Sequence, residues 1–350
     1  MKNILFITCI LIILFKTGNV LSDNNIFNVN NIEIGKEISK NKEKIVNQAF
    51  RKAFSQLINR LLLEEDYKRV SNTNLTDIKK LISYYQIQNS STKEEDINIK
   101  TVNIFFDKER MHKFFYNRNL LYSDIINTEA IIFPLLKKEK QYFIYTQNYF
   151  YENWNEESSS DLIKYILPAE NIENIQKINL NKENIYELNI SDFFSEYDIE
   201  NLIFVFIEIK KNKSAEVYLK TRIGGKKINK NLSFKNEKEL SQNKFNDIII
   251  SEVNNLVRDL IKSQNLIDVR TPSFLNAEIR INKKKSNLFE FNNRLKKIDL
   301  IDKFYVQEIN KDYVSIKIKY LGKISKIIDK FKDQEIDLIM KDGKWQLNII

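Results

Sequence analysis

The sequence predicts an α+β protein made of three small α/β-type sandwich domains, and three observations lead to this class. Hydrophobic residues make up 43% of the 350 residues, which is enough for cores in two or three domains. Segments with apolar residues at every second position, typical of strands, recur between segments with helical periodicity. The last part of the chain, 272–350, shows the order strand, helix, strand, strand, helix, strand, which is the ferredoxin-like split βαβ arrangement.

The first 22 residues resemble an export signal. Lys2 supplies a positive start, and Ile4–Phe15 is a run of twelve mostly apolar residues that ends at Lys16. A helix needs about 20 apolar residues to cross a bilayer, so this run is short for an anchor. We therefore expect 1–22 to be a signal peptide and the mature chain to be periplasmic or secreted. The alternative is an uncleaved anchor at residues 4–15, which would then be the protein's only membrane contact.

Composition excludes several kinds of chemistry. Cys9 is the only cysteine and lies in the predicted signal, and His112 is the only histidine. Zinc sites made of His and Cys are therefore excluded, as are Ser-His-Asp and Cys-His nucleophiles, unless His112 acts alone. The net charge of +9 is spread along the chain and carried mostly by lysine, which does not favour a nucleic-acid target. We expect no catalytic residue, no cofactor and no metal ligand.

The N-terminal domain, 23–127, is predicted to start with a strand and a long helix. Ala49 and Ala53 lie on the apolar face of that helix, where small side chains let a helix approach a sheet closely. Asp107 is placed to cap the last helix of this domain, which carries His112. The expected elements are strand Ile26–Ile34, helix Lys36–Leu63, helix Thr76–Tyr85, loop Gln88–Glu95, strand Ile97–Phe106 and helix Lys108–Asn119.

The central domain, 128–268, is organised around a strand that is apolar on both faces, Leu202–Ile209, as expected in the middle of a sheet. Gly224-Gly225 is interpreted as a hairpin turn, because a phosphate-binding loop needs more glycines and a following helix. The other expected elements are strands Ala130–Leu136, Gln141–Thr146, Ala215–Ile223 and Lys226–Phe234, a loop over Glu152–Ser160, and helices from Asp161 to Leu167, Ile190–Tyr197 and Phe245–Lys262.

The C-terminal domain, 272–350, follows a short linker at Arg270-Thr271-Pro272. Alternation in Val314, Ile316 and Ile318 predicts a sheet with one face covered by helices. The expected elements are strand Leu275–Ile281, helix Ser286–Ile298, strands Ile301–Ile309 and Tyr313–Leu321, helix Ser325–Phe331, strand Ile336–Met340, a turn at Asp342-Gly343 and a last strand Lys344–Ile349.

This order of elements resembles a bacterial family of exported proteins known only as a domain of unknown function, number twenty sixty-six. The matching pieces are the strand Ile26–Ile34, the helix Asn47–Leu62 (NQAFRKAFSQLINRLL), the strand closed by Phe106-Asp107, the strand Ala130–Leu136, and the passage Asp192–Ile209 (DFFSEYDIENLIFVFIEI). The central domain is also similar to the small N-terminal domain of periplasmic envelope proteins of the Tol type, which implies work by protein contact. No catalytic residues are established for the family, so the resemblance implies none here.

Three functions remain open. The first is a non-enzymatic scaffold or binding module of the cell envelope, with another envelope protein as partner. The second is a hydrolase of envelope polysaccharide that uses two carboxylates, and the acidic runs Glu94-Glu95-Asp96 and Glu156-Glu157 are the local candidates. The third is binding of a lipid or apolar ligand. If the aromatic segment Tyr142–Trp154 binds a sugar or lipid, Tyr149, Tyr151 and Trp154 are the expected stacking residues; otherwise these side chains pack in a core.

Overall fold

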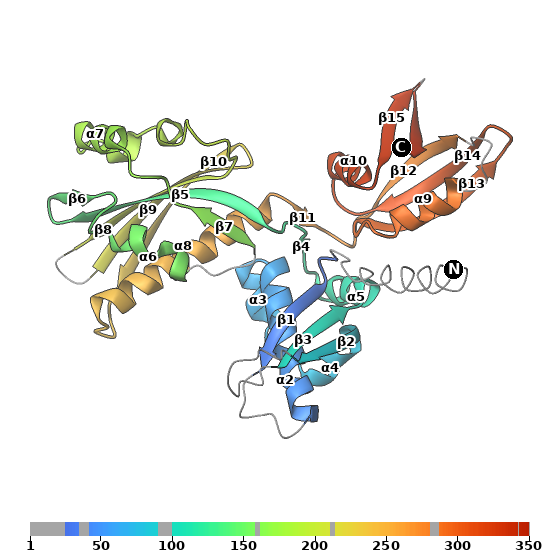
Figure 1. The fold of residues 1–350 in the computed structure, drawn as a ribbon, viewed down its shortest axis with the longest axis horizontal. Helices are drawn as coiled ribbons and strands as arrows, with labels where there is room; N and C mark the ends of the chain where they lie inside the picture. Colours follow the sequence, from blue (N-terminus) through green and yellow to red (C-terminus); the bar gives the residue numbers. More distant parts are fainter. Residues whose placement is uncertain are drawn as a thin grey trace, which may run out of the picture. The chain divides into compact units, whose positions relative to one another are not determined.

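The protein is an α+β molecule with several small sheets, as the sequence predicts (Figure 1). The computed structural model describes residues 25–34, 42–89, 100–157, 162–210, 214–280, 287–341 and 343–349. The predicted signal peptide and Cys9 lie outside these residues. Contacts group the chain into two compact units: unit 1 is Met1–Leu57, Thr73–Leu120 and Ile267–Ile350, and unit 2 is Ile58–Asn72 and Leu121–Leu266. The three domain boundaries stay a prediction. Within the described ranges, no helix is long and apolar enough to cross a membrane.

The N-terminal part of unit 1 is a three-stranded antiparallel sheet. Its strands are β1 (Asn28–Ile34), β3 (Lys100–Phe106) and β2 (Ile82–Asn89), in that order across the sheet. Helices α2 (Lys42–Leu61), α4 (Leu75–Leu81) and α5 (Lys108–Arg118) accompany it. Ala49 and Ala53 on α2 are fully buried, as their size predicts. The Asp107 side chain accepts a hydrogen bond from the Arg110 N–H at 2.9 Å, so the predicted cap of α5 is confirmed.

The helix predicted over Thr76–Tyr85 is wrong in its second half. Helix α4 ends at Leu81, and β2 begins at the next residue and runs to Asn89, into the segment expected to be a loop. The reason is a cross-strand contact: the Tyr84 ring stacks on Phe105 of β3 with 4.2 Å between ring centroids. Aromatic pairs of this kind stabilise a sheet, and they outweigh the weak local preference for continuing the helix.

Unit 2 is built on a six-stranded sheet in the order β10-β9-β8-β5-β6, with β7 paired to β5. The strands are β5 (Thr128–Lys138), β6 (Gln141–Phe143), β7 (Ile163–Ile166), β8 (Leu202–Ile209), β9 (Ser214–Ile223) and β10 (Lys226–Lys235). β5 runs parallel to β7 and β8, and the other pairs are antiparallel. β8 is central and buried through Ile207, as predicted, and Gly224 and Gly225 form the β9–β10 hairpin turn with φ of 52° and 77°.

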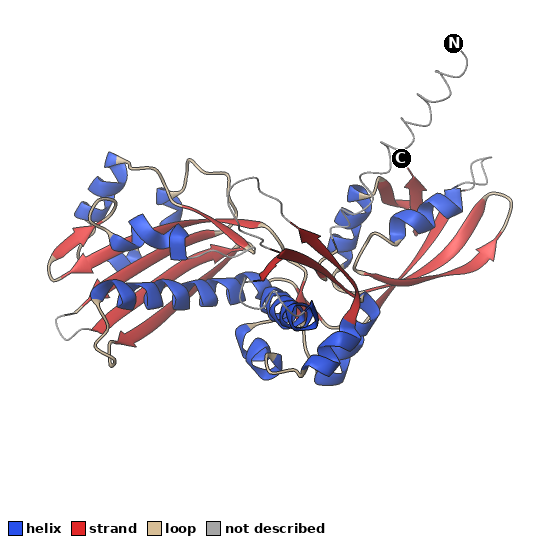
Figure 2. Ribbon diagram, turned by 60° about the horizontal axis from the view of Figure 1, so that its bottom comes forward, coloured by secondary structure: helices blue, strands red, loops and turns tan. Residues whose placement is uncertain are grey.

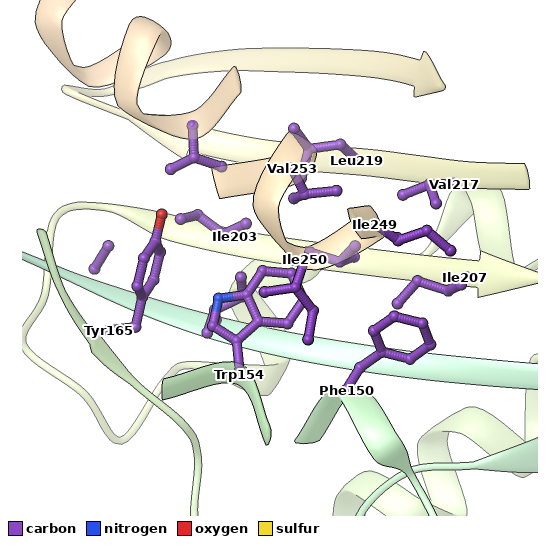
Figure 3. Packing of buried hydrophobic residues seen from close by; sticks show 14 of the residues in the cluster. Phe150, Trp154, Tyr165, Ile203, Ile207, Val217, Leu219, Ile249, Ile250 and Val253 are labelled. Atoms are coloured by element: carbon purple, nitrogen blue, oxygen red, sulfur yellow. The ribbon is translucent and has the colours of Figure 1, made fainter. Parts of the chain in front are cut away.

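Both faces of this sheet are covered. On one face, α8 (Gln242–Ser263) and α6 (Tyr149–Glu157) enclose a core with Ile203, Val205 and Ile207 of β8 (Figure 3). On the other face, α7 (Ile172–Leu180) and the 3-10 turns η2 (Ile185–Glu187) and η3 (Ile190–Phe193) pack over Phe204 and Phe206. The left part of Figure 2 shows this sheet with helices on both of its faces.

Several elements of unit 2 differ from the prediction. Helix α7 is not among the expected elements, and the helix expected over Ile190–Tyr197 is the 3-10 turn η3, which ends at Phe193. The expected loop Glu152–Ser160 is largely helix α6, and the expected helix ending at Leu167 contains strand β7 instead. In α6, Phe150 and Trp154 are spaced by four residues and both are fully buried, so burial of one helical face outweighs the polar composition around them. The sequence of β7 alternates buried Ile163 and Tyr165 with exposed Lys164, which is the period of a strand.

Two side chains of α8, one turn apart, join it to helix α3 (Glu64–Val70), which the sequence does not reveal, and to the end of α2. The Asp259 carboxylate accepts the Glu64 N–H at 3.0 Å, at the beginning of α3. The buried Lys262 ammonium donates to the carbonyl oxygens of Asn59 at 2.6 Å and Leu62 at 2.5 Å, at the end of α2. A carboxylate at a helix start and a cation at a helix end each complement the free backbone groups there.

The C-terminal part of unit 1 is a five-stranded sheet in the order β13-β14-β12-β16-β15. Its elements are β12 (Ser273–Arg280), α9 (Asn287–Leu295), β13 (Ile301–Ile309), β14 (Tyr313–Tyr320), α10 (Ile324–Asp333), β15 (Ile336–Lys341) and β16 (Lys344–Ile349). The predicted ferredoxin-like order of elements is confirmed. The last strand adds to it: β16 lies between β12 and β15 and runs parallel to β12. The remaining strands of the chain, β4 (Tyr122–Ser123) and β11 (Leu266–Ile267), have two residues each.

Candidate binding groove in the C-terminal sheet

Among the described residues, helices cover only one face of the C-terminal sheet. Along β14 the side chains alternate strictly, with Val314, Ile316 and Ile318 buried and Ser315 and Lys317 partly exposed between them. The buried set packs under α9 and α10, whose Phe291 and Phe331 are fully buried. Because strand side chains alternate between faces, the intervening residues of all five strands form one open face.

An aromatic ring and two lysines occupy the middle of this open face. Phe274 of β12 is 51% exposed, and the Lys317 ammonium lies 4.4 Å from the centroid of its ring, a cation–π contact. Lys344 forms an ion pair with Glu278 at 2.7 Å, and this hydrogen bond raises the pKa of Lys344 above its ordinary value. Among the described residues, Lys317 has no carboxylate within ion-pair distance, so its ammonium lies beside the exposed ring without an ion-pair partner.

A groove of about 480 Å³ opens beside the first half of β12. β14 pairs with β12 along its whole length, Ser273 to Arg280, whereas β16 pairs with β12 only from Ala277 to Ile279. Among the described residues, no strand therefore lies on that side of Ser273–Asn276. The side chains around the groove include Phe274, Asn276, Glu278, Met340, Lys344 and Trp345.

A smaller pocket of about 130 Å³ lies between α7 and η3 in unit 2. Two of its polar side chains are engaged in hydrogen bonds: the Asn174 amide donates to the Tyr145 hydroxyl at 3.2 Å, and Lys177 donates to the Asp192 carbonyl oxygen at 2.7 Å. Burial raises the pKa of Tyr145, so its hydroxyl stays neutral at physiological pH. The hydrogen bond of Lys177 holds α7 and η3 together.

The three aromatic residues predicted to stack on a ligand do not share a surface. Trp154 is fully buried in the core (Figure 3). Its indole N–H donates to Asn254 at 3.1 Å. Tyr149 is partly buried on the same side of the sheet, whereas Tyr151 packs with the cluster on the opposite side. The hydroxyl of Tyr151 donates to the Pro168 carbonyl oxygen at 2.8 Å. The geometry of all three agrees with packing in a core.

His112 is partly buried within unit 1. Its ring makes an edge contact with Phe27 at 5.6 Å between centroids, and burial together with the nearby Lys108 ammonium lowers its pKa to about 4. A histidine held neutral in this way suits packing. The carboxylate whose pKa is raised within the described residues, Asp259, already caps α3, and no group of metal-binding side chains occurs there. Glu94-Glu95-Asp96 lies outside the described part of the chain.

Comparison with protein-family models and with curated proteins gives no match. Among solved structures, the chain is similar to the crystal structure of lipoprotein GNA1162 from Neisseria meningitidis. The identity is 13% and the TM-score 0.25, over 37% of this chain and 95% of that chain. A similarity this low does not indicate a function for this chain.

Sequence reasoning missed the groove residues. Alternation along β12 separates Phe274 and Asn276 from Leu275 and Ala277, and this signal is present in the sequence. It does not show which strand lies beside β12. β16 pairs with only part of β12, and the length of this pairing depends on the register between two strands that are distant in the sequence. No local sequence pattern contains this information.

Proposed function

We propose that the chain is an exported cell-envelope protein that acts as a non-enzymatic binding module, with the groove and open face of the C-terminal sheet as its protein-binding surface. The observation that carries this proposal is the half-exposed ring of Phe274 beside Lys317, which forms no ion pair with any carboxylate of the described residues. Exposed apolar side chains that gather on one surface are typical of sites that bind another protein. The resemblance to an exported family, described above, agrees with this proposal.

Exposed apolar side chains are more numerous in the C-terminal part than in either of the other two predicted domains, and Phe274 and Tyr305 are the ones on the open face beside Lys317. Seven of the sixteen large hydrophobic side chains that are exposed in the described residues belong to the C-terminal part, although it is the shortest of the three predicted domains. They are Phe274, Phe289, Tyr305, Val306, Ile309, Ile339 and Met340. The central sheet, in contrast, has both faces covered.

The two other functions have less support from the geometry. A carboxylate-dependent hydrolase needs a pair of carboxylates in one cleft, with one of them held protonated by its surroundings. Asp259 is the described carboxylate with a raised pKa, and its oxygens accept the Glu64 N–H. Carriage of an apolar ligand needs a dry apolar cavity. The groove beside β12 is instead open and carries charged side chains.

Site-specific photocrosslinking in intact cells tests the proposed binding surface. A photoreactive phenylalanine analogue replaces Phe274 in one variant and Tyr186, which is similarly exposed at 54% but lies in unit 2, in the control. We expect a discrete crosslinked protein adduct at position 274 and none at position 186. Absence of any adduct at position 274, in a variant that folds normally, would overturn the proposed function.

Export has its own test. The mass of the purified mature chain is expected to correspond to a start near Asp23, after removal of the signal peptide. A chain that still begins at Met1 and stays with the membrane fraction would instead support the anchored form.

A further inference from the structure

We propose that the free side of β12 binds an extended acidic peptide segment of the partner, which adds as a strand beside Ser273–Asn276. This inference rests on the proposed function and names the chemistry of the partner at the same surface. Within the described part of the chain, three properties of the groove lead to it: a stretch of strand backbone that is paired on one side only, side chains on both faces of the gap, and a lysine that has no ion pair.

The backbone is the first property. Ser273–Asn276 are paired with β14 on one side, and the register with β16 begins only at Ala277. In a strand, alternate residues direct their N–H and C=O groups to each side, so this stretch offers hydrogen-bonding groups toward the groove. Four residues span about 13 Å at about 3.3 Å each, which fits a short extended peptide.

The position of the groove's side chains is the second property. Phe274 lies on the open face, whereas the pairing of Met340 with Trp345, and of Trp345 with Ala277, places these two on the face that the helices cover. The side chains of a strand inserted in the gap would alternate between the two faces. Every second one would lie near Phe274 on the open face, and the others would lie near Met340 and Trp345. Met340 is 54% exposed, so an apolar side chain has surface to cover there.

Charge is the third property, and it gives the peptide its chemistry. Lys344 is neutralised by Glu278, while Lys317 above the Phe274 ring has no carboxylate partner among the described residues. A carboxylate on the same face of the peptide as Phe274 would lie toward Lys317. The groove thus fits a segment in which acidic residues alternate with apolar ones, the acidic side chains on the open face and the apolar ones against Met340 and Trp345.

The test is binding of synthetic peptides to the full mature chain, followed by fluorescence anisotropy. The probe is an eight-residue labelled peptide of alternating valine and glutamate, and the comparison peptides replace glutamate with lysine or carry N-methyl groups on alternate backbone nitrogens. We expect the lysine peptide to bind about tenfold or more weakly than the glutamate peptide. The N-methylated peptide is expected to lose binding, because it cannot pair with β12.

Two variants show whether the groove is the place of binding. Lys317→Glu reverses the expected preference, so that the lysine peptide binds better than the glutamate peptide. Lys230→Glu reverses the same charge on the exposed strand β10 of unit 2 and is expected to leave binding unchanged. Equal binding of the N-methylated peptide, or an unchanged preference in Lys317→Glu, would overturn strand addition. If peptide binding fails while crosslinking at position 274 persists, strand addition is wrong and the proposed function stands.

Discussion

The two large sheets of the molecule are made from similar strands and are covered differently. The central sheet of unit 2 has helices on both faces, and β8 is buried from Leu202 to Ile207. The C-terminal sheet has helices on one face, and β14 alternates buried and partly exposed residues along its length. The difference is visible in the amino acids, since Leu202–Ile209 has only one charged residue whereas Tyr313–Tyr320 has two lysines. A two-sided core serves stability, and a one-sided sheet leaves a surface for binding.

The largest expected effect comes from truncating the two-sided core. Trp154→Ala removes a fully buried ring and its hydrogen bond to Asn254, so the free energy of unfolding should fall by about 3–5 kcal/mol. Phe274→Ala, on the open face, should change it by less than about 1 kcal/mol. Urea denaturation followed by far-UV circular dichroism measures both. Equal losses in the two variants would show that the C-terminal face is buried in solution.

The second prediction concerns the stability of unit 1 at low pH, because this unit contains the only histidine of the sequence. His112 has a pKa of about 4 when folded and about 6.5 when unfolded, so its neutral form favours the folded state. This contribution is fully present above pH 6.5 and is lost as pH falls toward 4, an expected loss of about 3 kcal/mol. Lys108 opposes protonation of His112, and Asp302 favours it.

Unfolding by urea at several pH values checks the acid effect. The variant His112→Gln should show a flatter pH dependence between 4 and 6.5 than the parent chain. Probes in unit 2, which contains no histidine, should report little change across this interval. A parent and a variant with identical pH profiles would mean that His112 is exposed to water.

A third effect is expected at Lys262, the buried cation of unit 2. Lys262→Met leaves the carbonyl oxygens of Asn59 and Leu62 without this donor, at an expected cost of about 2 kcal/mol. The matched change on the open face, Lys317→Met, should be within about 0.5 kcal/mol of neutral. Hydrogen exchange should also show faster opening of the end of α2 in Lys262→Met alone. Similar losses of unfolding free energy in both variants would contradict the assignment of Lys262 to a buried site and of Lys317 to an open face.

The smallest expected effect compares two hairpin turns. Gly224 and Gly343 both have positive φ, at 52° and 74°, so alanine is strained at either position. A Cβ at position 224 would also meet the Gln264 side chain, whereas none of the described atoms lies within 4 Å of a Cβ at position 343. Gly224→Ala should therefore cost about 1–2 kcal/mol and Gly343→Ala about 1 kcal/mol. Thermal unfolding compares them, and a larger loss at position 343 would contradict the packing around these turns.

Much of the fold follows from local patterns in the sequence. The cap at Asp107, the turn at Gly224-Gly225, the central strand Leu202–Ile209 and the ferredoxin-like order of elements are all confirmed. The errors occur where a distant contact decides. Ile82–Asn89 is a strand because it pairs with β3. Tyr149–Glu157 is a helix because this conformation buries Trp154 in the core.

The groove could not be predicted from the sequence, and the reason is physical. A single sequence shows that β12 has one apolar face and one mixed face, but the groove depends on where β16 stops beside it. The parallel insertion of β16 between β12 and β15 is a property of the whole sheet. Aromatic content, in turn, pointed to Tyr149, Tyr151 and Trp154, because composition does not distinguish a ring that packs inside from one that faces a ligand.

The link that α8 makes through Asp259 and Lys262 has a consequence for the order of folding. These side chains bind backbone groups that precede them by 195 to 203 residues, so the contacts close very long loops. Closing such loops costs entropy and slows folding. A chain delivered with its N-terminus first holds the end of α2 and the start of α3 without their partners until α8 follows. Unit 2 is therefore completed only after nearly three-quarters of the 350 residues are available.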